Sequence, residues 1–115
     1  MSHALIVRML GVREWWFPLD ERKSLKLRRP AELDLPGLRG GITIEKMKEI
    51  VVDWKGFTEA DLLGPTVGSD SVVAFDTEVM ALALADHSDW FAAAASEVME
   101  KVMDFLKQKA DIAKN

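Results

Sequence analysis

Trp54-Lys55-Gly56-Phe57-Thr58-Glu59-Ala60-Asp61 is the stretch that divides this chain into two different patterns. A helical spacing of apolar residues runs into it, and Gly56 breaks that spacing. Thr58 and Asp61 then have the spacing of a capping box, with Asp in place of the usual Glu. The stretch therefore predicts the end of one helix, followed by a single helical turn over residues 59–63.

On the N-terminal side of this stretch the sequence predicts strands. The aromatic residues of 14–17 suit a strand that ends at Pro18, and residues 24–28 alternate between leucine and basic residues. We expect these two runs to form an antiparallel hairpin with a loop of about four residues. The short apolar run 4–10 is compatible with a third strand or with a helix, because periodicity does not separate them at this length.

The remaining segments predict helices. Pro30 suits the first turn of a short helix, and the glycine-rich residues 36–41 predict a loop. Thr43 is a suitable cap for a helix that runs to Trp54, and Asp76 for one that runs to about residue 85. The longest helix is expected to start at Ser88 or Asp89 and to end near Lys109, with residues 110–115 as a frayed tail.

Together these patterns predict an α+β fold in one domain, residues 1–115. A β-rich part (1–30), with an antiparallel hairpin of two strands or three, is expected to pack on a helical part (43–109). The helical part would form a C-terminal bundle of three to four helices. The residues expected to be buried together are Trp54, Phe75, Phe91, Val98, Val102 and Phe105.

Composition narrows the class of protein. The 115 residues include no cysteine, and no signal segment or apolar run of about 18 residues is present, so we expect a cytoplasmic protein without a membrane partner. Residues 1–58 carry 11 basic and 8 acidic side chains, whereas residues 59–115 carry 4 and 11. This asymmetry is compatible with head-to-tail contact between copies or with docking on a charged partner. The simpler interpretation is that two faces of the protein differ in surface charge without a binding role.

The sequence contains no recognisable catalytic, cofactor-binding or metal-binding motif, so we do not expect an enzyme. The histidines are His3, near the terminus, and His87, which lies between Asp86 and Asp89. That cluster has the composition of a metal site, but helix capping by Ser88 or Asp89 beside an exposed histidine is the favoured interpretation.

A basic stripe follows the second strand, next to the aromatic first strand, as in some surfaces that bind nucleic acid. It comprises Arg22, Lys23, Lys26, Arg28 and Arg29. The acidic isoelectric point, about 5.1, argues against nucleic acid as a partner. We therefore favour an edge strand whose charges prevent aggregation.

Aromatic and methionine side chains are the best candidates for protein contacts. Trp15 and Trp16 should point to opposite faces of a strand, so that one joins the core and the other needs a cover. That cover is either residues 4–10 of the same chain or a partner. The full set of candidate interaction residues is Trp15, Trp16, Phe17, Arg28, Arg29, Met99 and Met103.

Residues 25–106 resemble the small tail assembly chaperones of tailed bacteriophages and prophages. The resemblance lies in an order of short patterns: Leu27-Arg28-Arg29-Pro30 before a glycine-rich loop, Trp54-Lys55-Gly56-Phe57, Thr58-Glu59-Ala60-Asp61-Leu62, Val73-Ala74-Phe75-Asp76 and Asp89-Trp90.

This resemblance implies a non-enzymatic protein of the bacterial cytoplasm that needs no cofactor. Its partners would be the tape-measure protein and the tail-tube subunits, with weak homo-oligomerisation as a further expectation. Many proteins of this family also have a longer form made by ribosomal frameshifting near the stop codon. For the lysine-rich end of this chain, cations that favour a helix C-terminus are the preferred interpretation. The alternatives are a virion structural or head-tail connector protein that self-associates, and a small DNA-binding regulator.

Overall fold

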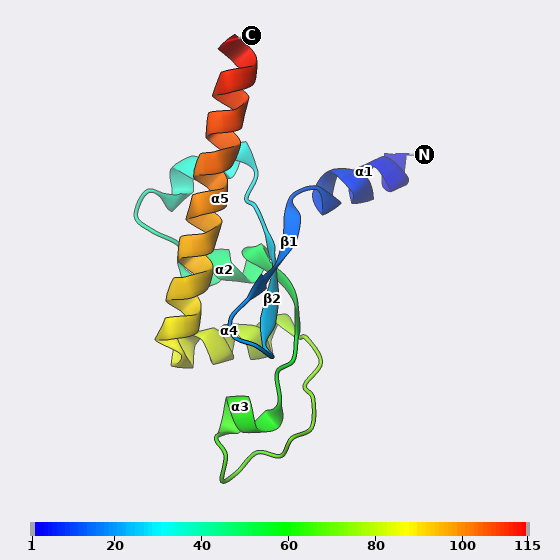
Figure 1. Cartoon of the computed structure of the whole chain (residues 1–115), viewed down its shortest axis with the longest axis vertical. Coiled ribbons are helices and arrows are strands. Elements are labelled where there is room, and N and C mark those ends of the chain that lie inside the picture. The colour runs from blue at the N-terminus through cyan, green and yellow to red at the C-terminus, as the bar shows by residue number, and fades with distance from the viewer. Residues whose placement is uncertain (1, 115) are drawn as a thin grey trace.

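Two layers make up the body of the molecule, a three-stranded sheet and the helices that cover one of its faces. The computed structural model describes residues 2–114. The helices are α1 (Ser2–Gly11), the 3-10 helix η1 (Glu32–Leu38), α2 (Ile44–Ile50), α3 (Glu59–Leu63), α4 (Thr77–Asp86) and α5 (Ser88–Lys114). The strands are β1 (Glu14–Pro18), β2 (Ser24–Arg28) and β3 (Val51–Lys55), and Figure 1 shows their arrangement. The predicted α+β class is confirmed.

The predicted hairpin is confirmed. Strands β1 and β2 pair antiparallel, with Trp16 opposite Lys26, and β1 forms one edge of the sheet. Strand β2 is the central strand of the order β1-β2-β3, so its basic residues do not guard an edge, and that interpretation of the basic stripe is wrong. Residues 4–10 form part of α1 and add no strand.

The helix predicted to run to Trp54 ends four residues earlier, at Ile50, and the chain continues as β3. Val51 lies opposite Leu27 and Trp54 opposite Leu25, with a bulge between those two pairs. Because the bulge inserts one extra residue, Val51 and Trp54 both turn toward the core although they lie three positions apart. The same spacing is typical of a helix, which is why the local pattern was misleading.

Caps fix the starts of three helices where the sequence placed them. The Thr43 hydroxyl accepts a hydrogen bond from the Lys46 amide, and the Asp76 carboxylate accepts two from the first turn of α4. Thr58 and Asp61 form the complete predicted capping box of α3. The long helix α5 begins at Ser88 as expected but continues to Lys114, so the predicted frayed tail is helical up to that residue. Asn115 lies outside the described residues.

The core lies between β2, β3 and the helices α2, α4 and α5. The expected burial of Trp54, Val98 and Val102 is confirmed, whereas Phe75 and Phe91 are half-buried at the rim of the core. Phe105 is also half-buried and lies outside this core, so its assignment was wrong. Side chains absent from the expected set make up most of the fully buried interior: Leu25, Leu27, Met47, Val51, Phe57, Met80 and Leu84.

Candidate interaction surfaces

The aromatic residues of β1 are divided between the two faces of the sheet, as predicted. Trp15 faces α5, where its indole Nε1 donates a hydrogen bond to the Glu97 carboxylate at 2.9 Å. Phe17 packs against the core from the same face. Trp16 points the other way and stays 39% exposed. Of the three, Trp16 is exposed, whereas Trp15 and Phe17 are half-buried.

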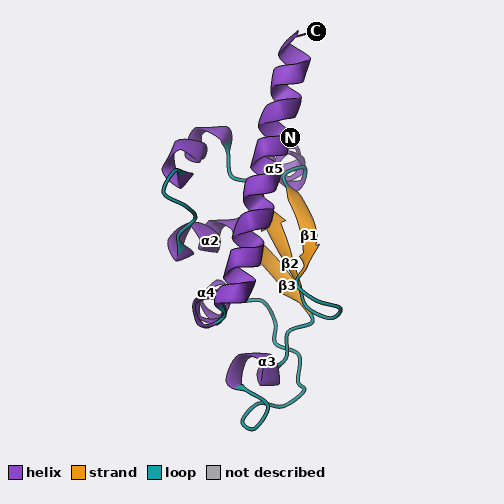
Figure 2. Ribbon diagram, turned by 60° about the vertical axis from the view of Figure 1, so that its left-hand side comes forward, coloured by secondary structure: helices purple, strands orange, loops and turns teal. Residues whose placement is uncertain are grey.

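Trp16 lies on an open sheet face. Figure 2 shows α2, α4 and α5 on one side of the sheet, and no helix of the described chain over the other. The ammonium groups of Lys55 and Lys26 lie 4.3 and 5.8 Å from the Trp16 ring centroid. Helix α1 extends away from the sheet (Figure 1), and none of its residues, all of them described, is buried, so it does not cover this tryptophan. The internal cover considered for Trp16 is therefore absent.

The two predicted arginines of the basic stripe point in different directions. Arg28 pairs with Glu14 across the hairpin. The Arg29 guanidinium instead lies 3.7 Å from the centroid of the Phe105 ring on α5, and it donates to the Pro30 carbonyl. Burial, together with the nearby charge of Arg13, lowers the pKa of Arg29. The stripe is thus not one continuous basic surface.

Met99 and Met103 do lie together, on a shallow apolar groove between η1 and α5. The groove encloses about 190 Å³ and is lined by Leu35, Leu38, Arg39, Met99, Val102, Met103 and Leu106. Met103 is well exposed and Met99 less so. We call this surface the methionine groove.

Two further apolar surfaces were not found from the sequence. Helix α1 exposes more than half of each of Leu5, Ile6, Val7 and Met9. A second groove of about 210 Å³ lies between α3 and α4, and we call it the α3–α4 groove. Its lining is Leu62, Leu63, Val79, Leu82, Ala83, Asp86 and His87. The apolar character of run 4–10 was visible, but which residues find no internal partner depends on tertiary packing.

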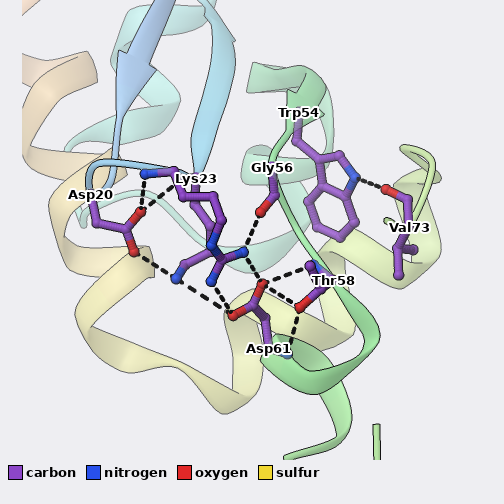
Figure 3. A network of polar contacts seen from close by, with 8 residues as sticks. Asp20, Lys23, Trp54, Gly56, Thr58, Asp61 and Val73 are labelled. Carbon is purple, nitrogen blue, oxygen red and sulfur yellow. Dashed lines mark hydrogen bonds and ion pairs between the residues drawn. The ribbon is translucent and has the colours of Figure 1, made fainter. Parts of the chain in front are cut away.

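A network of polar contacts fixes α3 to the hairpin turn (Figure 3). The Arg22 guanidinium makes two hydrogen bonds, of 2.6 and 2.8 Å, to the Asp61 carboxylate, and it also donates to the Gly56 carbonyl. Asp61 accepts further hydrogen bonds from the amide and hydroxyl of Thr58. These bonds hold the pKa of Asp61 well below its usual value. Arg22, at the hairpin turn, thus holds α3 in place.

Lys23 and Asp20 extend the same network. The Lys23 ammonium lies 2.6 Å from the Asp20 carboxylate and 3.7 Å from that of Asp61, and it is almost fully buried. Hydrogen bonds from Lys23 and from the Arg22 amide lower the pKa of Asp20 to about 2. Every ionised group in this cluster is paired, and the pairs join the hairpin turn to α3.

The Asp86-His87-Ser88-Asp89 segment does not gather a metal site. The His87 ring stacks on Trp90 with centroids 3.6 Å apart, and its Nδ1 lies 2.7 Å from the Ala83 carbonyl oxygen. Within residues 2–114 no group of three or more potential ligand side chains is close enough to share a metal ion. No helix in the same range is both long and apolar enough to span a bilayer.

Searches of protein-family models, of curated protein sequences and of solved structures found no match to this chain.

Proposed function

We propose that this protein is a non-enzymatic tail assembly chaperone of a tailed phage or prophage. It binds the tape-measure protein in the host cytoplasm and aids polymerisation of the tail tube. The proposal rests on the order of short patterns between residues 25 and 106 and on one structural observation, the exposed methionine groove beside α5.

The methionine groove has the properties that reversible binding of a helix requires. Its lining is almost entirely apolar, with Arg39 at its margin, so it suits the apolar face of an amphipathic helix. Methionine side chains adapt to partners of varied shape, which suits a long helical protein with many similar binding segments. A shallow groove of this size buries little surface, and tube subunits would therefore be able to displace the chaperone.

Co-expression with the tape-measure protein encoded in the same genome tests this role. The double variant Met99→Glu/Met103→Glu should lose the ability to keep that protein soluble, because two charges would have to be desolvated in the groove. Leu33→Glu is the matched control, since Leu33 is exposed and lies outside the groove. Equal rescue by wild type and by the correctly folded groove variant would rule out this binding site.

A virion structural or head-tail connector protein that self-associates is the second candidate, because exposed α1 offers apolar surface for contact between copies. Closed rings that persist at nanomolar concentration would support the connector. A monomer, or a weakly associating chain that rescues the tape-measure protein, would support the chaperone. DNA binding is not proposed, because Glu14 pairs with both Lys26 and Arg28, and Asp61 pairs with Arg22.

A further inference from the structure

Helix α1 is rich in apolar residues, and none of them is buried. Figure 1 shows it extending from the start of β1 away from the rest of the molecule. Leu5, Ile6, Val7 and Met9 are each more than half exposed. An isolated helix of ten residues is only marginally stable in water, because nucleation costs more than a few hydrogen bonds return. A second surface that covers α1 would therefore stabilise both its helical form and its apolar side chains.

The α3–α4 groove offers a second exposed apolar surface. Leu62, Leu63, Val79 and Leu82 give it an apolar lining, and Leu82 is 71% exposed. Asp86 supplies a carboxylate at the same groove. An apolar helix in an apolar groove is a recurring mode of recognition between proteins.

Charge selects this groove over the methionine groove as the site for α1. Residues 2–13 include Arg8 and Arg13 but no acidic residue. Residues 56–100, which supply the α3–α4 groove, contain nine acidic residues and neither lysine nor arginine. The methionine groove instead carries Arg39, which would repel Arg8.

We propose that α1 of one copy docks in the α3–α4 groove of a second copy. In this structure α1 lies away from the groove of its own chain (Figure 1). Helix α1 joins the start of β1 through Val12 and Arg13, whereas α3 is fixed to the hairpin turn beyond the other end of β1 by the Arg22–Asp61 pair. Five strand residues, about 16 Å, separate the two ends, so each copy presents α1 and its groove at opposite ends of β1.

The resulting contact is head-to-tail. Each copy uses α1 on one side and its groove on the other, so copies add one to the next, and the array grows until it closes or dissociates. Helix α1 is only about 15 Å long, so each contact is small and the association is weak and dependent on concentration. Self-association through these surfaces does not require the chaperone role.

Sedimentation equilibrium of the full chain tests the contact. Wild type should show a mass that rises with concentration into the micromolar range. Leu5→Glu/Met9→Glu in the helix and Leu63→Glu/Leu82→Glu in the groove should each remain at the monomer mass. Leu33→Glu/Ile112→Glu, which changes two exposed residues outside both surfaces, should behave as wild type. Circular dichroism verifies that every variant is folded.

Mixing the two defective variants gives the sharpest result. The helix variant retains an intact groove and the groove variant retains an intact α1, so an equimolar mixture should form a dimer that grows no further. A mixture that stays monomeric, a monomeric wild type at 100 µM, or control variants that dissociate equally would each overturn the proposal. Met99→Glu/Met103→Glu should keep the wild-type association, which separates failure of this contact from failure of tape-measure binding.

Discussion

The first half of α5 and the whole of α1 are both rich in apolar residues, but only one of them contributes to the core. Ala94, Val98 and Val102 are buried because Leu25 and Leu27 of β2 lie in the same cluster. Helix α1 has comparable side chains, and none of them is buried. Apolar sequence alone therefore does not produce burial, and the buried core and the exposed apolar surface lie in different regions.

The largest expected effect separates the core from its surroundings. Phe57 is fully buried and stacks on Trp54 with ring centroids 4.2 Å apart. Phe57→Ala should lower the free energy of unfolding by about 3–5 kcal/mol, because a large cavity is left in a close-packed interior. Phe105→Ala, outside the core, should cost about 1 kcal/mol. Denaturant unfolding of both variants makes the measurement, and equal losses would refute the division.

Substitution of two glycines tests the same difference between the body of the molecule and α1. Gly56 has a φ of +82°, and a Cβ there would lie 1.9 Å from the Arg22 carbonyl oxygen. Gly56→Ala should therefore cost at least about 2 kcal/mol. Gly11 at the end of α1 has open space around it, so Gly11→Ala should change the free energy of unfolding by less than about 0.5 kcal/mol. Thermal unfolding of the two variants under identical conditions provides the test.

The ion pair between Arg22 and Asp61, which joins the hairpin turn to α3, should make the free energy of unfolding fall at acidic pH. The folded-state pKa of Asp61 lies below its usual value of 3.8, so its carboxylate stabilises the fold fully above that value. This contribution is lost progressively as the pH falls below about 4. Asp61→Asn should cost about 1–2 kcal/mol at pH 7, a figure reduced because the Arg22 side chain is half exposed.

The difference between wild type and Asp61→Asn should shrink when unfolding is repeated between pH 4 and pH 2. A constant difference over that range would show that the charge of Asp61 does not matter. Arg22→Gln should show the same trend, because it removes the partner of the same carboxylate.

The smallest expected effect is in α1. Leu5→Glu/Met9→Glu should change the free energy of unfolding of the isolated monomer by less than about 0.5 kcal/mol, since both side chains are already exposed. Unfolding should be measured at low protein concentration, so that association between copies does not contribute to the free energy of unfolding. A loss above about 2 kcal/mol would show that α1 packs on the body of its own chain.

The sequence was sufficient to predict the segments whose structure depends on residues close by in the chain. Thr43, the Thr58–Asp61 pair and Asp76 cap helices where predicted, because each bond joins residues two or three positions apart. The alternation in β2 was equally direct, because Leu25 and Leu27 share one face of a strand.

Among the candidate interaction residues, the sequence correctly separated Trp15 from Trp16 but did not separate Arg28 from Arg29. The division of the tryptophans follows from strand geometry alone. The direction of Arg29 depends on Phe105, which lies 76 positions away on α5.

Local sequence patterns were therefore sufficient to predict the class of fold, the hairpin, the caps and the start of the long helix. Residues 51–55 have a helical spacing of apolar residues but form a strand, and tertiary structure decided this. Strand β2 offers them hydrogen bonds and two buried leucines, which no local pattern reveals. Tertiary structure also decided that α1 stays uncovered while α5 is half-buried. The physical reason is the same in each case: an apolar side chain is buried only where an element distant in sequence lies opposite to receive it.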